Sequence, residues 1–299
     1  MNGNVAAKQE RGEAADCFVA ATGRPISNEE FRSFQKLIHQ EAGIHLGEHK
    51  KALLVGRLNK RLRELGLDSF TDYYHRVSEK GNGEELVHML DCICTNETQF
   101  FREPQHFEFL EDRVFSQWEA LASSGRRERR IRVWSTACST GEEPYSLAMT
   151  LLQRFPKSSG WAIEIVATDL STRVLDRAAT AIWPIEKSRD IPDPYLKSFM
   201  LKGKGVNKGV MAAGPWIRSV VKFRRLNLNG ASYPISGVFD LIFCRNVLIY
   251  FDAASKTRVV NRLLGHLAPQ GYLFLGHSEG LTGASNRLRR IIPTVSTHA

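Results

Sequence analysis

The sequence predicts an α/β fold, in which a doubly wound parallel sheet with a small β insertion follows a small all-α N-terminal domain. From about residue 130 onward, short apolar runs alternate with helical patterns, which is typical of a parallel sheet with connecting helices. Before about residue 92 the apolar residues recur only at helical spacing. Glycine-rich sequence with two strand-like pieces interrupts the alternation at about 184–234.

The all-α domain is expected over residues 25–92. Ser27, followed three residues later by Glu30, predicts a capping box at the start of the first helix. Gly43 is expected to end that helix and Gly66 the second one. A third helix is expected to start near Ser69, and a fourth runs to about residue 93. The apolar positions of the second helix are Leu54, Leu58, Leu62 and Leu65.

Four apolar runs predict strands of the parallel sheet. They cover residues 131–136, 161–168, 239–244 and 271–276. A helix is expected at 145–155. The two strand-like pieces of the insertion, 209–212 and 216–223, are expected to lie outside the main sheet. The α/β domain is expected over 130–299, with a linker at 93–129 and a flexible tail at 1–24.

Composition indicates a globular protein of a reducing compartment. Of the 299 residues, 42% are hydrophobic and 24% charged, and no apolar run reaches the roughly 20 residues of a membrane-spanning helix. The polar N-terminus does not resemble a secretory signal. The five scattered cysteines argue against a disulfide framework and for the cytoplasm. The net charge of +9 fits an acidic partner, which could be nucleic acid, an anionic membrane or an acidic protein, but many cytosolic enzymes are also mildly basic.

The turn after the first strand is the first candidate ligand site, because ligands bind at the carboxyl ends of parallel strands. Its sequence, Ser-Thr-Gly-Glu-Glu-Pro at 139–144, is not the dinucleotide fingerprint. Glu142 and Glu143 lie where a pyrophosphate needs neutral or positive groups. This argues against NAD, FAD and ATP and for a ligand with a cationic end, such as S-adenosylmethionine (SAM). The alternative is that both glutamates only complement the helix dipole.

Two further strand ends carry polar residues. Asp169 ends the second strand, where an acidic residue accepts hydrogen bonds from ribose hydroxyls in Rossmann-type sites, although an aspartate there can also cap a helix. The third strand leads into Cys-Arg-Asn at 244–246. DNA adenine methyltransferases carry Asn or Asp followed by Pro-Pro and an aromatic residue at this position. Because that motif is absent, the sequence disfavours a nucleic-acid substrate.

Several stretches, taken together and in order, resemble the CheR-type chemoreceptor glutamate methyltransferases. They read TNETQFFRE at 95–103, ACSTGEEPYS at 137–146, ATDL at 167–170, NL at 227–228, FCRNVLIYF at 243–251 and GHSE at 276–279. Each stretch alone is weakly specific, but six in the family's order are specific. The resemblance spans nearly all of 27–279. It implies a Rossmann-like SAM-dependent methyltransferase domain with an inserted β subdomain, preceded by an all-α domain.

The resemblance also implies the site residues. By position, the cofactor-binding set is Asn96, Thr98, Arg102, Glu143, Asp169, Asn227, Leu228, Arg245 and Asn246. Glu143 would hold the amino end of SAM and Asp169 its ribose, while residues 227–228 would contact the adenine and 245–246 the region of the sulfonium. Arg102 and Tyr250 are the expected catalytic residues, beside the transferred methyl and the incoming carboxylate. The product is S-adenosylhomocysteine, and no metal is expected.

The chemistry that the resemblance implies needs no general base. A glutamate carboxylate has an unperturbed pKa of about 4.3 and is already ionised at neutral pH. The expected task of the protein is therefore to position the reactants for an in-line displacement.

The family resemblance makes the all-α domain the docking surface for the acidic helical bundle of a chemoreceptor. The candidate docking residues are Lys50, Arg57, Lys60 and Arg61. The alternative is a solvated helix face, which is usual for a run of charges. A monomer without nucleic-acid binding or membrane insertion is expected. Two rival hypotheses are a non-catalytic signalling module and a methyltransferase for another protein or nucleic acid.

One departure from the family concerns the C-terminus. Thr294 and Val295 are followed by Ser-Thr-His-Ala rather than by an aromatic residue. We therefore expect a shortened last strand that could weaken the edge of the sheet.

Overall fold

The computed structural model describes residues 24–79, 81–280 and 287–299. The expected tail at 1–24 thus lies outside the described residues except for Arg24. The described residues divide into two compact units, one within 24–37 and 46–86 and the other within 38–45 and 87–299. In the described part of the chain, no helix is both long and apolar enough to cross a membrane.

The helical pattern predicted for the N-terminal part is confirmed. The helices are α1 (Asn28–Ala42), α2 (Lys51–Glu64), α3 (Phe70–Ser78) and α4 (Gly83–Ile93), with a 3-10 turn, η1 (Glu48–Lys50), before α2. The capping box forms, because the Glu30 N–H donates to Ser27 Oγ at 3.1 Å and the Ser27 N–H to Glu30 Oε2 at 2.8 Å. Gly43 and Gly66 follow their helices with φ of 71° and 66°, a conformation that glycine adopts without strain.

The second unit is built on a seven-stranded sheet of order β6-β2-β1-β7-β8-β10-β9. Its parallel strands are β1 (Arg130–Ser135), β2 (Ala162–Asp169), β6 (Val221–Arg225), β7 (Phe239–Cys244) and β8 (Leu267–Leu275). Two antiparallel strands, β9 (Leu288–Ile292) and β10 (Val295–His298), complete it. All four predicted parallel strands are therefore confirmed.

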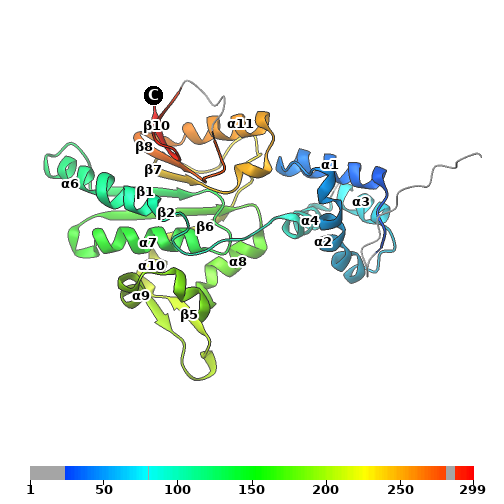
Figure 1. The fold of residues 1–299 in the computed structure, drawn as a ribbon, viewed down its shortest axis with the longest axis horizontal. Coiled ribbons are helices and arrows are strands. Elements are labelled where there is room, and N and C mark those ends of the chain that lie inside the picture. Colours follow the sequence, from blue (N-terminus) through cyan, green and yellow to red (C-terminus); the bar gives the residue numbers. More distant parts are fainter. Residues whose placement is uncertain (1–23, 80, 281–286) are drawn as a thin grey trace, which may run out of the picture. The chain divides into compact units, whose positions relative to one another are not determined.

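Helices cover both faces of this sheet (Figure 1). Successive side chains of a strand point to opposite faces, and in β1 Val133 belongs to one apolar cluster and Trp134 to the other. The first cluster includes Leu147 and Leu151 of α7 (Glu142–Arg154), and the second includes Val259 of α11 (Ala253–Leu264). Three further helices contribute to the first cluster: α8 (Thr172–Thr180), α5 (Gln105–Phe109) and α6 (Ser116–Ser123). A π-helical stretch, Leu110–Phe115, lies between α5 and α6.

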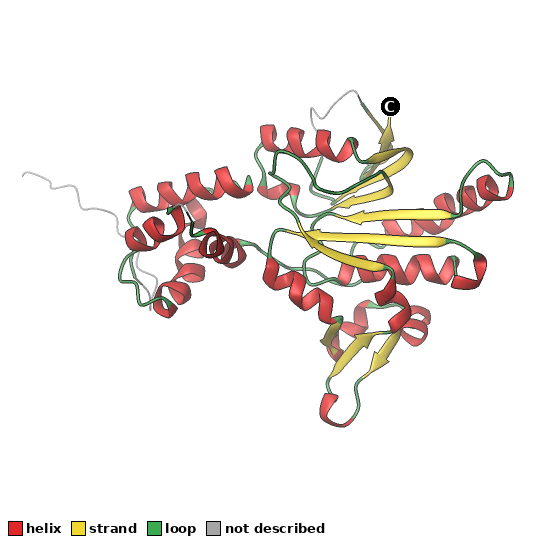
Figure 2. Ribbon diagram, turned by 180° about the vertical axis from the view of Figure 1, so that it is seen from behind, coloured by secondary structure: helices red, strands yellow, loops and turns green. Residues whose placement is uncertain are grey.

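The β insertion is a separate three-stranded antiparallel sheet of order β3-β5-β4 (Figure 2). Its strands are β3 (Ile182–Pro184), β4 (Met200–Lys202) and β5 (Val210–Ala213), and α9 (Asp193–Phe199) and α10 (Pro215–Ser219) flank them. A short 3-10 helix, η4 (Ile185–Asp190), follows β3.

The expectation that 216–223 forms a strand of the insertion is wrong. Pro215 occupies the start of α10, a position that suits its fixed φ. The following residues form β6, which pairs in parallel with β2 from Ile165↔Val221 to Asp169↔Arg225. The expected insertion at 184–234 thus contains a strand of the main sheet. One side of β2 pairs with β1, and the backbone groups on its other side pair with β6.

The expectation for the last strand is also corrected. The strand β10 is short, but it lies inside the sheet between β8 and β9, so it forms no edge. Val295 is fully buried in the core. The edge position on this side is occupied by β9.

Candidate active site

The candidate site lies where the parallel strands β2, β1 and β7 end side by side. Ser135 at the end of β1 is paired with Ala167 of β2 and with Phe243 of β7. The segments that follow these strands therefore meet at one edge of the sheet. The Ser139 N–H donates to Asp169 Oδ2 at 2.8 Å, which joins the turn after β1 to the end of β2.

The turn after β1 requires glycine at position 141. Gly141 has φ of 96° and immediately precedes α7. A β-carbon at this position would lie 3.0 Å from Ala178 Cβ of α8, so both the backbone conformation and the packing disfavour any side chain. The turn thus brings α7 close to α8 and sets the direction of the glutamates at its start.

The two glutamates of the turn have different partners. Glu142 is fully buried and forms an ion pair with Lys187 of η4. Glu143, which is 8% exposed, accepts from Ser135 Oγ at 2.6 Å and from Arg245 Nε at 2.7 Å. Lys187 therefore neutralises one carboxylate locally. The other lies at the sheet edge, held by one residue from the end of β1 and one from the end of β7.

The linker segment is attached to the same edge through its backbone. The Asn96 carbonyl accepts from Ser139 Oγ at 2.9 Å, and the Arg102 carbonyl accepts from Arg245 Nη1 at 2.6 Å. The Thr98 carbonyl accepts from Lys187 Nζ at 3.3 Å. These contacts join Asn96 to the turn after β1, Arg102 to the loop after β7, and Thr98 to Lys187, the ion-pair partner of Glu142.

Backbone strain is concentrated in these segments. Five non-glycine residues with a positive φ occur in the described ranges 24–79, 81–280 and 287–299, and four of them, Phe101, Glu103, Ser139 and Asn246, belong to the linker, the turn and the loop after β7. Such conformations cost about 1–3 kcal/mol each and persist where the surrounding structure enforces them. Their clustering is typical of a functional site.

The loop after β7 is organised by Glu279, for which the sequence predicted no role. Its carboxylate accepts the N–H groups of Gly276 at 2.7 Å, Asn246 at 2.8 Å, Leu248 at 2.6 Å and Ile249 at 3.3 Å. Burial raises the pKa of Glu279, and these N–H donors oppose the shift. The signal in the sequence was the Gly-His-Ser-Glu stretch, but it did not identify what Glu279 binds.

Asp169 and the residues after β6 form the other end of the site. The Leu226 N–H donates to the Asp169 carbonyl at 2.9 Å, so the segment after β6 starts beside Asp169. Asn227 Nδ2 donates to the Glu41 carbonyl at 2.6 Å, and Leu228 is buried in the core. Burial raises the pKa of Asp169, although N–H donors such as that of Ser139 lower it.

The predicted catalytic pair comes from two of the joined segments. Arg102 is half-buried, and its Nη1 donates to the Glu97 carbonyl at 3.2 Å. Tyr250 ends a short 3-10 turn, Leu248–Tyr250, that follows the loop held by Glu279. The joint action of Arg102 and Tyr250 on a substrate remains a prediction.

Comparison with known proteins assigns the family. The family model of the CheR methyltransferase SAM-binding domain matches residues 96–296, and the family model of the CheR all-alpha domain matches residues 29–94. Chemotaxis protein methyltransferase 2 of Pseudomonas aeruginosa is 39% identical over 91% of this chain and 94% of its own length. The chemotaxis protein methyltransferase of Escherichia coli is 37% identical over 88% of each chain. The chain belongs to the CheR methyltransferase family.

CheR membership makes the protein a methyltransferase with SAM as its cofactor, and the donor set at the sheet edge fits that cofactor. Glu143 and Asp169 are buried carboxylates, and each carboxylate offers about four lone-pair sites, so both can accept from a ligand beyond their present partners. Within the described residues, no hydrogen bond or ion pair involves Arg245 Nη2. SAM requires acceptors for its ammonium and ribose and a donor for its carboxylate, and this edge of the CheR fold has all three.

The predicted docking residues of the CheR all-alpha domain differ in their surroundings. Lys60 is exposed and lies 3.8 Å from Glu64, whereas Lys50 and Arg57 are half-buried. Arg61 donates from Nε and Nη2 to the two carboxylate oxygens of Glu85, at 2.9 and 2.6 Å. Arg61 thus has a structural partner inside the helical unit, which the charge pattern did not reveal.

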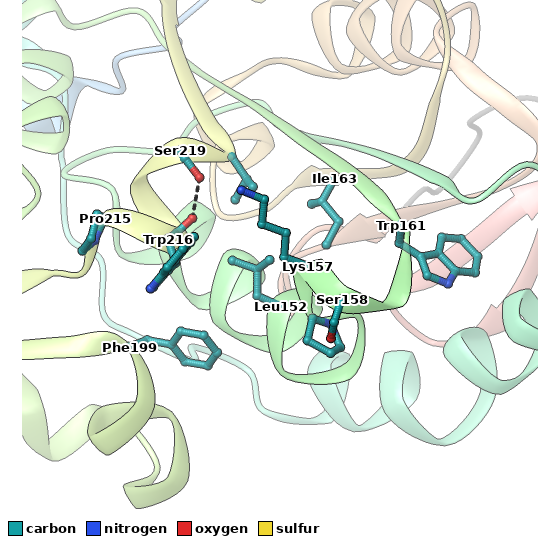
Figure 3. A pocket seen from close by; sticks show the side chains of 11 residues that line it. Leu152, Lys157, Ser158, Trp161, Ile163, Phe199, Pro215, Trp216 and Ser219 are labelled. Atoms are coloured by element: carbon teal, nitrogen blue, oxygen red, sulfur yellow. Dashed lines mark hydrogen bonds between the residues drawn. The ribbon is translucent and has the colours of Figure 1, made fainter.

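A cavity of about 700 Å³ does not belong to this site. It lies at the start of β2, whereas Asp169 is at the end of that strand. Apolar side chains dominate its walls, and Lys157 Nζ lies 5.4 Å from the ring of Trp216 (Figure 3).

Proposed function

We propose that the protein methylates glutamate side-chain carboxylates of chemoreceptors in the cytoplasm, with SAM as the methyl donor. The names of the relatives support the receptor as substrate class. The resemblance of the linker, turn and strand-end motifs to chemoreceptor glutamate methyltransferases carries the choice of a carboxylate, and the state of His106, the buried histidine beside Arg245, is consistent with it. Both of its ring nitrogens have partners, and burial and the Arg245 charge lower its pKa to about 3. The neutral form of His106 is therefore favoured at neutral pH, and an acceptor that arrives ionised needs no general base.

The chemistry divides simply between cofactor and protein. SAM supplies a methyl group on a positively charged sulfonium. A carboxylate oxygen forms the new C–O bond as the S–CH₃ bond breaks, the two charges cancel, and no proton moves. The protein's contribution is orientation, which can lower a barrier by roughly 7–11 kcal/mol when two reactants are well placed. In this proposal Glu143, Asp169 and Arg245 hold the cofactor.

Arg102 and Tyr250 are the proposed substrate-orienting residues. Arg102 belongs to the strained linker and Tyr250 to the loop that Glu279 holds. A guanidinium and a phenol are both suitable donors to a carboxylate. Arg102 should orient the carboxylate without pairing with it too strongly, because the carboxylate loses charge in the reaction and a strong ion pair would stabilise the ground state more than the transition state.

The test combines cofactor binding with methyl transfer. Calorimetry with S-adenosylhomocysteine measures affinity, and a labelled-methyl assay on a receptor cytoplasmic fragment measures turnover. We expect Arg102→Ala and Tyr250→Phe to lower turnover at saturating SAM by at least about tenfold, beyond any loss of affinity. The exposed Glu128→Gln is the control. Full turnover in both variants contradicts these roles, and absence of cofactor binding in the wild type contradicts the proposed function.

We also propose that α2 and the turn before it dock the receptor through Lys50, Arg57 and Lys60. A cationic surface suits an acidic partner, and such contacts weaken with salt. Arg57→Glu and Lys60→Glu should each weaken binding to a receptor fragment severalfold at low salt and leave S-adenosylhomocysteine affinity unchanged. Arg61→Gln should instead destabilise the helices, because it removes the charged partner of buried Glu85 and leaves that carboxylate with Tyr73 as a neutral donor. Binding that resists both salt and the two charge reversals shows that this face is only solvated.

A further inference from the structure

The inference starts from the hydrogen bonds around Arg245. Its Nε donates to Glu143. Its Nη1 has two hydrogens, and two acceptors lie within reach, the Arg102 carbonyl at 2.6 Å and His106 Nδ1 at 3.1 Å. Because Arg245 is only 6% exposed, water cannot readily replace these partners. The orientation of the guanidinium therefore depends on all three acceptors.

The contact with Arg245 determines the protonation of His106. A guanidinium has no lone pair to offer, so Nδ1 of His106 must accept and cannot carry a hydrogen. The proton of the neutral ring is then on Nε2, which lies 2.6 Å from Thr294 Oγ1. Thr294 directly precedes β10. His106 is fully buried, so no solvent competes for either nitrogen.

We propose that His106 is a positioning residue that orients Arg245, and through it Glu143, for SAM binding, and that Thr294 holds the ring in place by accepting the hydrogen of Nε2. The proposed series runs from Thr294 through His106 and Arg245 to Glu143. It rests on the proposed roles of Arg245 and Glu143 as cofactor ligands. His106 does not touch the cofactor or the transferred methyl in this scheme.

Groups around the ring favour the neutral form. His106 faces Arg245 and His277, whose charges lower its pKa together with burial, the largest cause. Glu103 Oε2 lies 3.5 Å from Nδ1 and 3.7 Å from Arg245 Nη1. Arg245 lies closer to Nδ1 than Glu103 does, so the guanidinium takes the nitrogen lone pair. The Phe274 ring lies 5.3 Å from the imidazole, centroid to centroid, and adds an apolar wall.

The first experiment compares two His106 variants in the full-length protein. His106→Leu removes both polar contacts and should raise the Kd for S-adenosylhomocysteine about tenfold or more, the usual effect of losing a hydrogen bond to a charged group. His106→Asn can place its Oδ1 near the position of Nδ1 and should recover to within about threefold of wild type. At saturating SAM, kcat should change less than KM for SAM, and KM for the receptor should not change. Equal losses in all three quantities, or no rescue by Asn, indicate a merely structural residue.

A second pair of variants tests Thr294 if His106→Leu does not fold. Thr294→Val is nearly isosteric but removes the acceptor, and Thr294→Ser keeps it. The Val variant should weaken S-adenosylhomocysteine binding severalfold, and the Ser variant should match wild type. In ¹⁵N NMR of the wild type, His106 should show protonated Nε2 and unprotonated Nδ1 at pH 7. A protonated Nδ1, or equal affinities in the two variants, overturns the inference.

Glu143→Gln separates this inference from the proposed function. It should weaken S-adenosylhomocysteine binding if Glu143 is a cofactor ligand. If it does not, the assigned cofactor site is wrong, and the role of His106 fails with it. If Glu143→Gln weakens binding while His106→Leu and Thr294→Val do not, the site stands and only the series through His106 is overturned.

Discussion

At the scale of single residues, buried polar groups hold the candidate site in one conformation. Glu279 connects the end of β8 with the loop after β7, and its two oxygens share four backbone N–H groups. Within the described part of the chain, the N–H groups of Asn246 and Gly276 have Glu279 as their only acceptor. The carboxylate thus replaces the regular secondary structure that this loop lacks.

Replacement of Glu279 by glutamine should therefore affect both stability and cofactor binding. The amide NH₂ of glutamine would face two N–H donors, and each buried N–H left unpaired costs about 1–3 kcal/mol. We expect the free energy of unfolding, measured in urea, to fall by about 2–4 kcal/mol, with weaker S-adenosylhomocysteine binding. Glu128→Gln, an exposed substitution, should change neither quantity. Unchanged stability in Glu279→Gln shows that the loop does not depend on the carboxylate.

At the scale of elements, the start of α11 is stabilised by a charged cap. Asp252 Oδ1 accepts the Ser255 N–H at 2.7 Å, and His39 Nε2 lies 2.5 Å from Oδ2. These contacts, the Ser255 N–H first and His39 second, lower the pKa of Asp252 to about 2. An aspartate in an unfolded chain has a pKa of about 3.9. Because the folded-state value is the lower one, Asp252 stabilises the fold above the unfolded pKa and loses that contribution as the pH falls toward 2.

The cap leads to a pH-dependent prediction. The Asp252 side chain is 34% exposed, so solvent screening should limit the charge contribution to about 1 kcal/mol at pH 7. Asp252→Asn, which retains an oxygen for the Ser255 N–H, should be less stable by that amount at pH 7 and by about half of it at pH 3. Asp252→Ala should lose about a further 1 kcal/mol with the cap itself. Denaturant unfolding across this pH range is the measurement, and a wild-type–Asn difference independent of pH contradicts it.

At the scale of the whole molecule, the last residues of the chain complete both the core and the site. In β10, Val295 pairs with Phe274 of β8 and with Ile292 of β9. Thr294, directly before it, contacts His106, which lies 188 positions earlier in the sequence. The C-terminus thus connects the far side of the sheet with the linker segment.

A chain shortened to end at Thr294 tests this connection. Without β10, β8 has an unpaired edge and β9 has no neighbour, and buried Val295 is lost from the core. We expect a loss of at least about 3 kcal/mol in unfolding free energy and a tendency to associate through the open edge. Denaturation and size-exclusion chromatography measure both effects. Deletion of Ala299 alone is the control, and a shortened chain as stable and monodisperse as wild type contradicts the assigned role of β10.

Patterns in the sequence predicted most elements because they depend on local spacing. The capping box at Ser27, the glycine after α1 and the four apolar strands are determined by residues only a few positions apart. The failure at 216–223 has a different cause. Whether Val221–Arg225 joins the insertion or the main sheet depends on an open partner strand more than 50 residues earlier in the chain, namely β2.

The residues of the candidate site also differ in whether the sequence alone could predict them. The Glu-rich turn, Asp169, and Arg245 at the end of a strand could be selected from the sequence, because parallel strands bring their carboxyl ends to one edge. The partners of Arg61, His106 and Glu279 could not. Arg61 and Glu85 are 24 positions apart, His106 and Thr294 are 188 apart, and Glu279 and Leu248 are 31 apart. No local pattern in the sequence indicates such pairings.

The sequence by itself determined the fold class, the family motifs and the end of the parallel strands at which the candidate site lies. Only the tertiary structure decided which glutamate of the turn is neutralised by Lys187 and which is held by Arg245. It also decided that β10 is an interior strand and that His106 lies between Arg245 and Thr294. The physical reason is that spacing along the chain sets helices and strands, whereas the partner of a buried charge is set by what the completed fold brings within hydrogen-bonding distance.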